Sequence, residues 1–296
     1  MSDYGEYELV EHPLGFIEVS PKPTSEELRD YYRAQYYEKA EGKTSQYSYE
    51  YGPTERIYKQ LGARETYHLM ERSKGSVMEL GYGEGFFLGY FAEQGWDVAG
   101  VDFTDEGLMQ YFPHLRDRLA AEDVYEYTDR AIAAGERYDL LVTNNVIEHV
   151  IEPLELLEAM RKVIKPEGIL RAVVPNDGSW LHRHLVDNEL GRDNFWIAPP
   201  AHLNYFTFDT FKRALEATGW EVVAMTGEFP IEIFCLHEGS NYLKDRAQGR
   251  GSHKARVAFD VALANEGIDK LMAFRKGCAA AGLGRNVVAY ARPRSD

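Results

Sequence analysis

From Ser76 onward, short apolar and β-branched runs alternate with stretches in which apolar residues recur at helical spacing. The runs that read as strands are 76–80, 97–102, 138–144, 168–175, 220–227 and 285–293, with a weakly marked third strand at 119–127. Helical patterns lie between them at 86–95, 153–168 and 209–220. Gly168 and Gly219 suit the ends of the last two helices. This alternation predicts an α/β fold, a mostly parallel seven-stranded sheet with helices on both faces.

The pattern before Ser76 is helical instead. Thr24 and Glu27 have the spacing of a capping box, in which each side chain accepts a hydrogen bond from the other residue's backbone N–H. A second helical pattern covers 53–75. We expect this N-terminal part to form a helical cap or lid over the sheet.

Composition excludes several classes of protein. The chain has 296 residues, of which 44% are hydrophobic and 13% aromatic, enough for one large domain or a domain with a cap. No run approaches the roughly 18 apolar residues of a membrane helix, and the acidic start shows no signal peptide. The formal charge of −15 disfavours nucleic acid as a partner.

Two cysteines, Cys235 and Cys278, make neither a disulfide framework nor a metal-ligand cluster. We therefore expect a cytoplasmic protein with no metal, no nucleic-acid partner and no membrane contact.

The stretch "SVMELGYGEGFF" links a strand to a helix through a glycine-rich turn. Its glycines are Gly81, Gly83 and Gly85. A dinucleotide fingerprint would place the third glycine one position later, at Phe86, and no Walker lysine follows. Glu79 at the strand end suits a cationic ligand better than a pyrophosphate. Asp102, which ends the next strand, is placed to accept hydrogen bonds from both hydroxyls of a ribose.

These motifs together resemble a class I S-adenosylmethionine-dependent methyltransferase. The resemblance is carried by "VMELGYGEG", "GVD", "YDLLVTNNVIEHV", "KPEGIL" and "VVPN", and it covers roughly residues 76–227. The stretch "HLNYFT" is similar to a small-molecule subgroup with "EH" after the fourth strand. One departure is Tyr82, where the family usually has a small residue, and which we expect to contact the methionine portion of the cofactor. The resemblance implies a Rossmann-like fold, S-adenosyl-L-methionine as cofactor and S-adenosyl-L-homocysteine as product.

Carried over to this chain, the resemblance implies a set of cofactor-binding residues. Glu79 and the backbone of the glycine turn hold the methionine end, Asp102 the ribose, and Phe103 lies beside the adenine. Asp123 reaches the adenine amino group. Asn144 and Asn145 line the amino-acid part of the cofactor and the reaction centre. An alternative is that Asp102 and Asn145 only cap helices.

The resemblance also suggests four parts. These are an N-terminal helical lid (1–75), a cofactor-binding core (76–230), an insertion with an acceptor-binding role (231–283), and the last core strand and tail (284–296). Tyrosines are dense before Tyr58, and Tyr37 and Tyr47 are candidates for contact with the ligand. Helix packing accounts for several of the others.

The insertion contains a basic stretch, "NYLKDRAQGRGSHKAR", with five cations and one acid in an acidic protein. Arg246 and Arg250 are candidate ligands for an anionic acceptor, such as a sugar phosphate or nucleotide sugar, because arginine binds phosphate in a bidentate manner. His237 and Tyr205 are further candidate acceptor-binding residues. The alternative is a solvated basic loop.

A hydroxyl acceptor must lose its proton, and histidine is the usual general base near neutral pH. His149 directly follows Glu148 after the fourth strand, and His202 opens a segment expected to cross the same edge. Both are candidate bases, although a lone histidine is more often structural.

The nucleic-acid amino methyltransferases have an Asn/Asp-Pro-Pro-aromatic turn where this chain reads "NNVIEH", which disfavours base amines as acceptors. The leading hypothesis is therefore O-methylation of a sugar or nucleotide-linked sugar. One alternative is a methyltransferase for a phenolic natural product or quinone precursor. Another, of a different class, is a cofactor-binding subunit without catalytic activity. Oligomeric state is left open.

Overall fold

The computed structural model describes residues 7–28, 31 and 50–294. Within these residues the chain forms a central seven-stranded sheet, with strand order β5-β4-β3-β6-β7-β10-β9. The strands are β3 (Ser76–Leu80), β4 (Asp97–Asp102), β5 (Leu119–Ala121), β6 (Tyr138–Asn144), β7 (Ile164–Pro175), β9 (Trp220–Gly227) and β10 (Asn286–Pro293). The pairs from β5 to β7 are parallel, and β10 runs antiparallel to both β7 and β9. The predicted fold class is confirmed.

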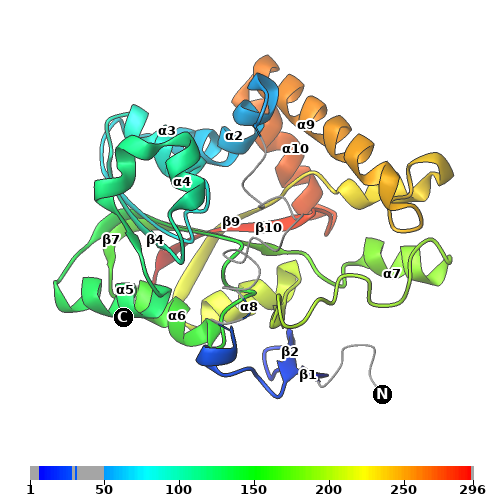
Figure 1. Cartoon of the computed structure of the whole chain (residues 1–296), viewed down its shortest axis with the longest axis horizontal. Coiled ribbons are helices and arrows are strands. Elements are labelled where there is room, and N and C mark those ends of the chain that lie inside the picture. The colour runs from blue at the N-terminus through cyan, green and yellow to red at the C-terminus, as the bar shows by residue number, and fades with distance from the viewer. Residues whose placement is uncertain (1–6, 29–30, 32–49, 295–296) are drawn as a thin grey trace, which may run out of the picture.

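Helices cover both faces of this sheet (Figure 1). One face carries α2 (Pro53–Met70), α3 (Phe86–Glu93) and α4 (Glu106–Tyr111), and the other carries α5 (Val124–Ala133), α6 (Pro153–Met160) and α8 (Phe208–Ala217). The strand sequences explain this arrangement, because neighbouring side chains of a strand point to opposite faces. In β3, buried Val77 packs with the first group of helices and buried Met78 with the second.

A second, three-stranded antiparallel sheet was not expected from the sequence. It consists of β1 (Glu8–Glu11), β2 (Ile17–Ser20) and β8 (Asn204–Tyr205), in the order β1-β2-β8. The first two of these segments are thus strands and not part of a helical cap. The reason is a contact distant in sequence: Ile17 pairs with Tyr205. The capping box of Thr24 and Glu27 is confirmed, with backbone-to-side-chain hydrogen bonds of 2.8 and 3.2 Å.

Two further expectations were wrong in detail. Only residues 119–121 of the predicted third strand are extended, because Asp123 begins α5 as its N-terminal cap and residues 124–127 are helical. Gly168 does not end a helix, since α6 stops at Met160 and β7 already starts at Ile164. Gly219, by contrast, follows α8 with a left-handed φ of 83°, as expected for a residue that ends a helix.

The insertion before the last strand is mostly helical. It contains three short 3-10 turns (Ile231–Leu236, Glu238–Ser240 and Arg246–Gln248), followed by α9 (Gly249–Glu266) and α10 (Ile268–Ala280). The buried guanidinium of Arg275 ties it to α2, donating to Glu65 at 2.6 Å and to Asp260 of α9 at 2.9 Å. The basic stretch, residues 241–256, extends into the first turns of α9. No helix among the described residues is both long and apolar enough to cross a bilayer.

Candidate active site

The glycine turn between β3 and α3 requires glycine for two physical reasons. Gly81, Gly83 and Gly85 have φ values of 75°, 53° and 77°, in the left-handed region that disfavours a side chain. A Cβ on Gly81 would also lie 2.3 Å from Cγ2 of Val146. The turn therefore exposes bare backbone at the carboxyl edge of the sheet, where ligands of parallel sheets bind.

Asp102 fastens this turn to the end of β4. Its Oδ2 accepts a hydrogen bond of 2.8 Å from the backbone N–H of Gly83, and its Oδ1 accepts a longer one of 3.4 Å from Thr104. Burial raises the pKa of the Asp102 carboxyl, against the lowering effect of these N–H groups. Asp102 thus orders the glycine turn, a role that was not predicted for it. The adjacent Phe103 is 37% exposed.

Asp123 acts as a helix cap. Its Oδ1 accepts hydrogen bonds from the backbone N–H of Tyr125 at 2.8 Å and Glu126 at 3.3 Å. Asp102 and Asn145 are not helix caps, since the N-cap of α4 is Asp105 and that of α6 is Glu152. Because Asp123 lies at the carboxyl edge, it still borders the cavity described below.

Asn144 ends β6 and is held from two sides. Its amide nitrogen donates to Oε1 of Glu79 at 2.6 Å, and its amide oxygen accepts from the buried Arg171 of β7. Burial raises the pKa of Glu79 to about 8. The second oxygen of Glu79 is buried and has no hydrogen-bond partner among the described residues. Sequence reasoning missed Arg171, because a cation inside a hydrophobic strand gives no motif.

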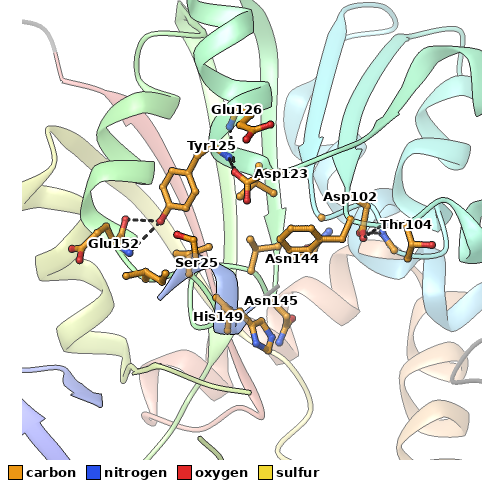
Figure 2. Close-up of a pocket in the computed structure, with 18 of the residues that line it drawn as sticks. Ser25, Asp102, Thr104, Asp123, Tyr125, Glu126, Asn144, Asn145, His149 and Glu152 are labelled. Atoms are coloured by element: carbon orange, nitrogen blue, oxygen red, sulfur yellow. Dashed lines mark hydrogen bonds between the residues drawn. The ribbon is translucent and has the colours of Figure 1, made fainter. Parts of the chain in front are cut away.

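These residues surround a cavity of about 540 Å³ at the carboxyl edge of β3, β4, β5 and β6. Figure 2 shows Asp102 and Thr104 on one side, Asp123 and Tyr125 on another, and Asn145 beside His149. The predicted residues that line it are Gly81, Gly83, Asp102, Phe103, Asp123, Asn144, Asn145 and His149. Ser25 and Leu28 also line it, so the N-terminal segment forms part of its wall.

Other predicted residues lie elsewhere. Tyr82 and Tyr205 are buried at 4% exposure each, and the Tyr205 hydroxyl bonds the backbone of Ala198 and His202. Gly85 forms the N-terminal cap of α3. His237, Arg246 and Arg250 are exposed and outside the lining of this cavity. Tyr37 and Tyr47 lie outside the described residues.

The two candidate bases meet in space. The rings of His149 and His202 pack edge to face with centroids 4.8 Å apart. Nδ1 of His149 contacts the carbonyl oxygen of Ala201, which can only accept, so this nitrogen carries the proton. Burial lowers the pKa of His149, and it lowers that of His202 to about 3. The structure thus brings together two residues that the sequence only suggested separately.

Three charged residues beside this pair were not predicted as functional. Glu148 and Asp177 are 0% and 4% exposed, and burial raises the pKa of each to about 8. Arg285, just before β10, donates to Oε1 of Glu232 at 3.1 Å. The position of Asp177 two residues after β7, at the carboxyl edge, was the available sequence signal for this residue.

The sequence of the core matches a known protein family. Residues 54–225 fit the family model described as "Methyltransferase domain". The chain belongs to this methyltransferase family. The match covers more than half of the chain. It includes β3, β4, β5 and β6, whose carboxyl ends border the cavity.

Curated relatives of this methyltransferase include two proteins named ubiquinone biosynthesis O-methyltransferase. The one from Cereibacter sphaeroides (strain KD131 / KCTC 12085) is 33% identical over 95 residues, which are 32% of this chain and 38% of the relative. The one from Dinoroseobacter shibae is 31% identical over 157 residues, which are 51% of this chain and 62% of the relative. The chain thus matches less than two thirds of the length of either relative.

Two solved structures share the fold. A SAM-dependent methyltransferase from Archaeoglobus fulgidus superposes with a TM-score of 0.50 at 20% identity, covering 81% of this chain and 95% of the other. The 1,6-didemethyltoxoflavin-N1-methyltransferase from Burkholderia thailandensis, solved with S-adenosylhomocysteine, has a TM-score of 0.52 at 15% identity, covering 100% and 99%. The family and the fold make the chain an enzyme whose methyl donor is S-adenosyl-L-methionine.

The cavity fits this donor. Its volume lies in the range of small-molecule sites, roughly 300–1,000 Å³. It combines bare glycine backbone, a buried carboxylate at a strand end and the exposed ring of Phe103. The carboxylates and the side-chain amides supply acceptors and donors for the polar groups of a nucleoside and an amino acid.

Proposed function

We propose that this enzyme transfers a methyl group to a hydroxyl of a small phenolic acceptor, of the kind that precedes a quinone. The names of the curated relatives support this alternative and lend no support to a sugar. The observation that carries the proposal is structural. His149 lines the cavity at the turn after β6 and packs against His202, so it can serve as the proton acceptor for a hydroxyl that enters this cavity.

For the donor we propose the following roles. Asp102 binds the ribose hydroxyls, Phe103 packs beside the adenine, and the backbone of Gly81 and Gly83 approaches the amino-acid part. Asn144 faces the cavity with Glu79 behind it. Because the oxygen of the Asn144 amide accepts from Arg171 and one N–H donates to Glu79, the second N–H of this amide is the donor left to meet the ligand.

The chemistry then needs a base and exclusion of water. When bound, the donor supplies an electrophilic methyl group on a sulfonium. As the acceptor oxygen bonds to that methyl carbon, the carbon–sulfur bond breaks and the sulfur becomes a neutral thioether. His149 or His202 takes the hydroxyl proton. Ser25 and Leu28 close the cavity from the N-terminal side, which keeps solvent from competing with the acceptor.

The basic stretch of the insertion supports a second candidate, an anionic acceptor. Arg246 and Arg250 are exposed, so they could meet a phosphate only outside the cavity described above. If they do, replacing either with Ala raises the acceptor KM at low salt, and the effect shrinks at high salt because exposed charges are screened. Unchanged KM values at both salt concentrations would remove this candidate.

The deciding experiment incubates the enzyme with S-adenosyl-L-methionine labelled on the methyl group and three acceptors. These are an ortho-dihydroxybenzene, a monohydroxybenzene and a nucleotide sugar. We expect label in a phenol methyl ether and an equal amount of S-adenosyl-L-homocysteine. Label only in the nucleotide sugar would overturn the proposal. The matched control is Asp102→Ala, which should give less product at a donor concentration below saturation, because donor binding is weakened.

A further inference from the structure

Three potential metal ligands from two separate segments meet at the carboxyl edge of the sheet. An oxygen of Glu148 and a ring nitrogen each of His149 and His202 all lie within 4.8 Å of one another. Glu148 and His149 lie in the turn after β6, whereas His202 lies just before β8. Backbone hydrogen bonds join the segments, because the carbonyl oxygen of Glu148 accepts from Leu203 at 2.8 Å and from Asn204 at 3.1 Å.

Glu148 is the first sign that this cluster binds a ligand. Its side chain is fully buried, and the side-chain amide of Asn145 is its nearby hydrogen-bonding group. Neither carboxyl oxygen makes a hydrogen bond of normal geometry within the part of the chain that the structure describes. An isolated buried carboxylate is costly unless a proton or a cation neutralises it.

The histidines have the orientation that metal ligands need. The contact of His149 Nδ1 with the carbonyl of Ala201 fixes the tautomer, so Nε2 is the nitrogen with the lone pair, and it lies 3.7 Å from Oε1 of Glu148. Metal-binding histidines commonly donate their other N–H to a backbone carbonyl in this way. Nδ1 of His202 is buried and has no partner among the described residues.

The surrounding charge also favours a cation. Asp177 is buried, and its Oδ2 has no hydrogen-bond partner in the described ranges. Arg285 is the nearby positive charge, and it pairs with Glu232. Among the described residues, neither Glu148 nor Asp177 makes an ion pair with Arg285, so this guanidinium neutralises Glu232 and leaves the other two carboxyl groups without a paired cation of their own.

We propose that Glu148, His149 and His202 bind one divalent metal ion of the zinc type. Two nitrogens and one carboxylate suit Zn²⁺, Co²⁺ or Mn²⁺ better than Mg²⁺ or Ca²⁺, which prefer oxygen alone. Metal–ligand bonds of about 2.0–2.2 Å place the ligand atoms of a tetrahedral site roughly 3.4 Å from one another. Side-chain rotations that move these atoms by about 1 Å would therefore complete the site.

Three protein ligands leave one position open, as in catalytic metal sites. His149 also lines the donor cavity, so the open position faces the reaction centre. With the ion bound, the two histidines act as ligands in place of their role as the base: the ion lowers the pKa of the acceptor hydroxyl, and the proton passes to water. This catalytic role rests on the proposed function, whereas the binding site itself does not.

The test uses the whole chain without a histidine tag, stripped with EDTA. It is titrated calorimetrically with ZnCl₂, and with CoCl₂ followed by the visible d–d bands of bound Co²⁺. We expect one equivalent to bind with a Kd in the micromolar range or below. Glu148→Gln and His202→Ala should each weaken binding at least tenfold. His253→Ala is the matched control, because His253 pairs with Glu55 at 3.0 Å at the surface, and it should leave Zn²⁺ affinity unchanged.

Absence of one-to-one binding to the wild-type chain overturns the proposal, and so does binding that responds to His253→Ala but not to the other two variants. Circular dichroism and S-adenosyl-L-homocysteine affinity show whether each variant is folded. If Glu148→Gln fails to fold, His202→Ala and the Co²⁺ spectrum of the wild type decide. Methylation of a phenol in EDTA at the wild-type rate would exclude the catalytic role while the proposed function stood. Metal binding without phenol methylation would exclude the proposed function, while the metal site itself would stand.

Discussion

The backbone N–H of Gly83 donates a hydrogen bond of 2.8 Å to Oδ2 of Asp102. This bond joins the glycine turn after β3 to the end of β4, so the two motifs that carry the methyltransferase resemblance support each other physically. A single carboxylate thus orders the loop and also borders the donor cavity.

Replacing Asp102 with Ala should weaken binding of S-adenosyl-L-homocysteine by about 1.5–3 kcal/mol, the usual value of hydrogen bonds to a charged group. Calorimetry measures the change directly. Asp105→Ala is the control, because Asp105 pairs with Arg116 nearby and does not line the cavity. Equal losses in both variants would mean that the effect is general and not specific to the ribose contact.

A comparison of Gly81→Ala with Gly95→Ala separates two contributions to the loss of unfolding free energy. One is the steric clash of the new Cβ, and the other is the strain of an alanine at positive φ. Both glycines have a positive φ, 75° and 78°, which costs an alanine roughly 1–2 kcal/mol. Only Gly81 has a close neighbour, Val146, whereas a Cβ on Gly95 meets nothing within 4 Å. We expect Gly81→Ala to lose a further 1–3 kcal/mol or so of unfolding free energy in urea, the usual cost of overpacking. Equal unfolding free energies for the two variants would contradict the close approach of Val146 to Gly81.

Glu79→Gln should change how stability depends on pH. The folded-state pKa of Glu79 is raised to about 8 from an ordinary value of 4.5. The folded protein therefore holds this proton between these two values, and its stability falls as the pH rises through that window, by at most ~1.4 kcal/mol per pH unit. Gln mimics the protonated form and still accepts from Asn144. In urea unfolding, the variant should gain relative to wild type from pH 5 to pH 8, and a constant difference would exclude the raised pKa.

Arg275→Met should cost about 3–5 kcal/mol of unfolding free energy, because it leaves Glu65 and Asp260 as buried charges without their cation. The control is Lys270→Met on the same helix, which removes an exposed ion pair with Glu266 and should cost well under 1 kcal/mol. Similar losses for both variants would show that α10 is not anchored through Arg275.

His202→Ala should lower methyl transfer to a hydroxyl acceptor by about 10²–10⁴-fold while leaving affinity for S-adenosyl-L-homocysteine unchanged, since His202 does not line the donor cavity. Turnover and calorimetry on one preparation measure both quantities. His114→Ala, which changes a histidine against Phe112 in the 3-10 turn after α4, is the control. Wild-type turnover in His202→Ala would assign proton removal to another group.

The sequence alone determined the features that depend on short-range patterns. The strand–helix alternation follows from the spacing of apolar residues, and the turn at Gly81 follows from glycines that only a positive φ explains. Asp102 was placed correctly because a strand end fixes where its last side chain lies. The seven-stranded sheet and the edge at which its cavity lies were therefore predictable.

The tertiary structure decided what residues distant in sequence do together. Glu148 and His202 meet because the carbonyl oxygen of Glu148 accepts from the backbone of Leu203, and β1 and β2 exist because β8 pairs with them. Arg171 has no evident role in the hydrophobic sequence of β7. Its role is visible only in the fold, where it donates to Asn144, which in turn donates to Glu79. Local patterns determine the direction of a side chain, but its neighbours across the fold determine its charge, its partners and so its chemistry.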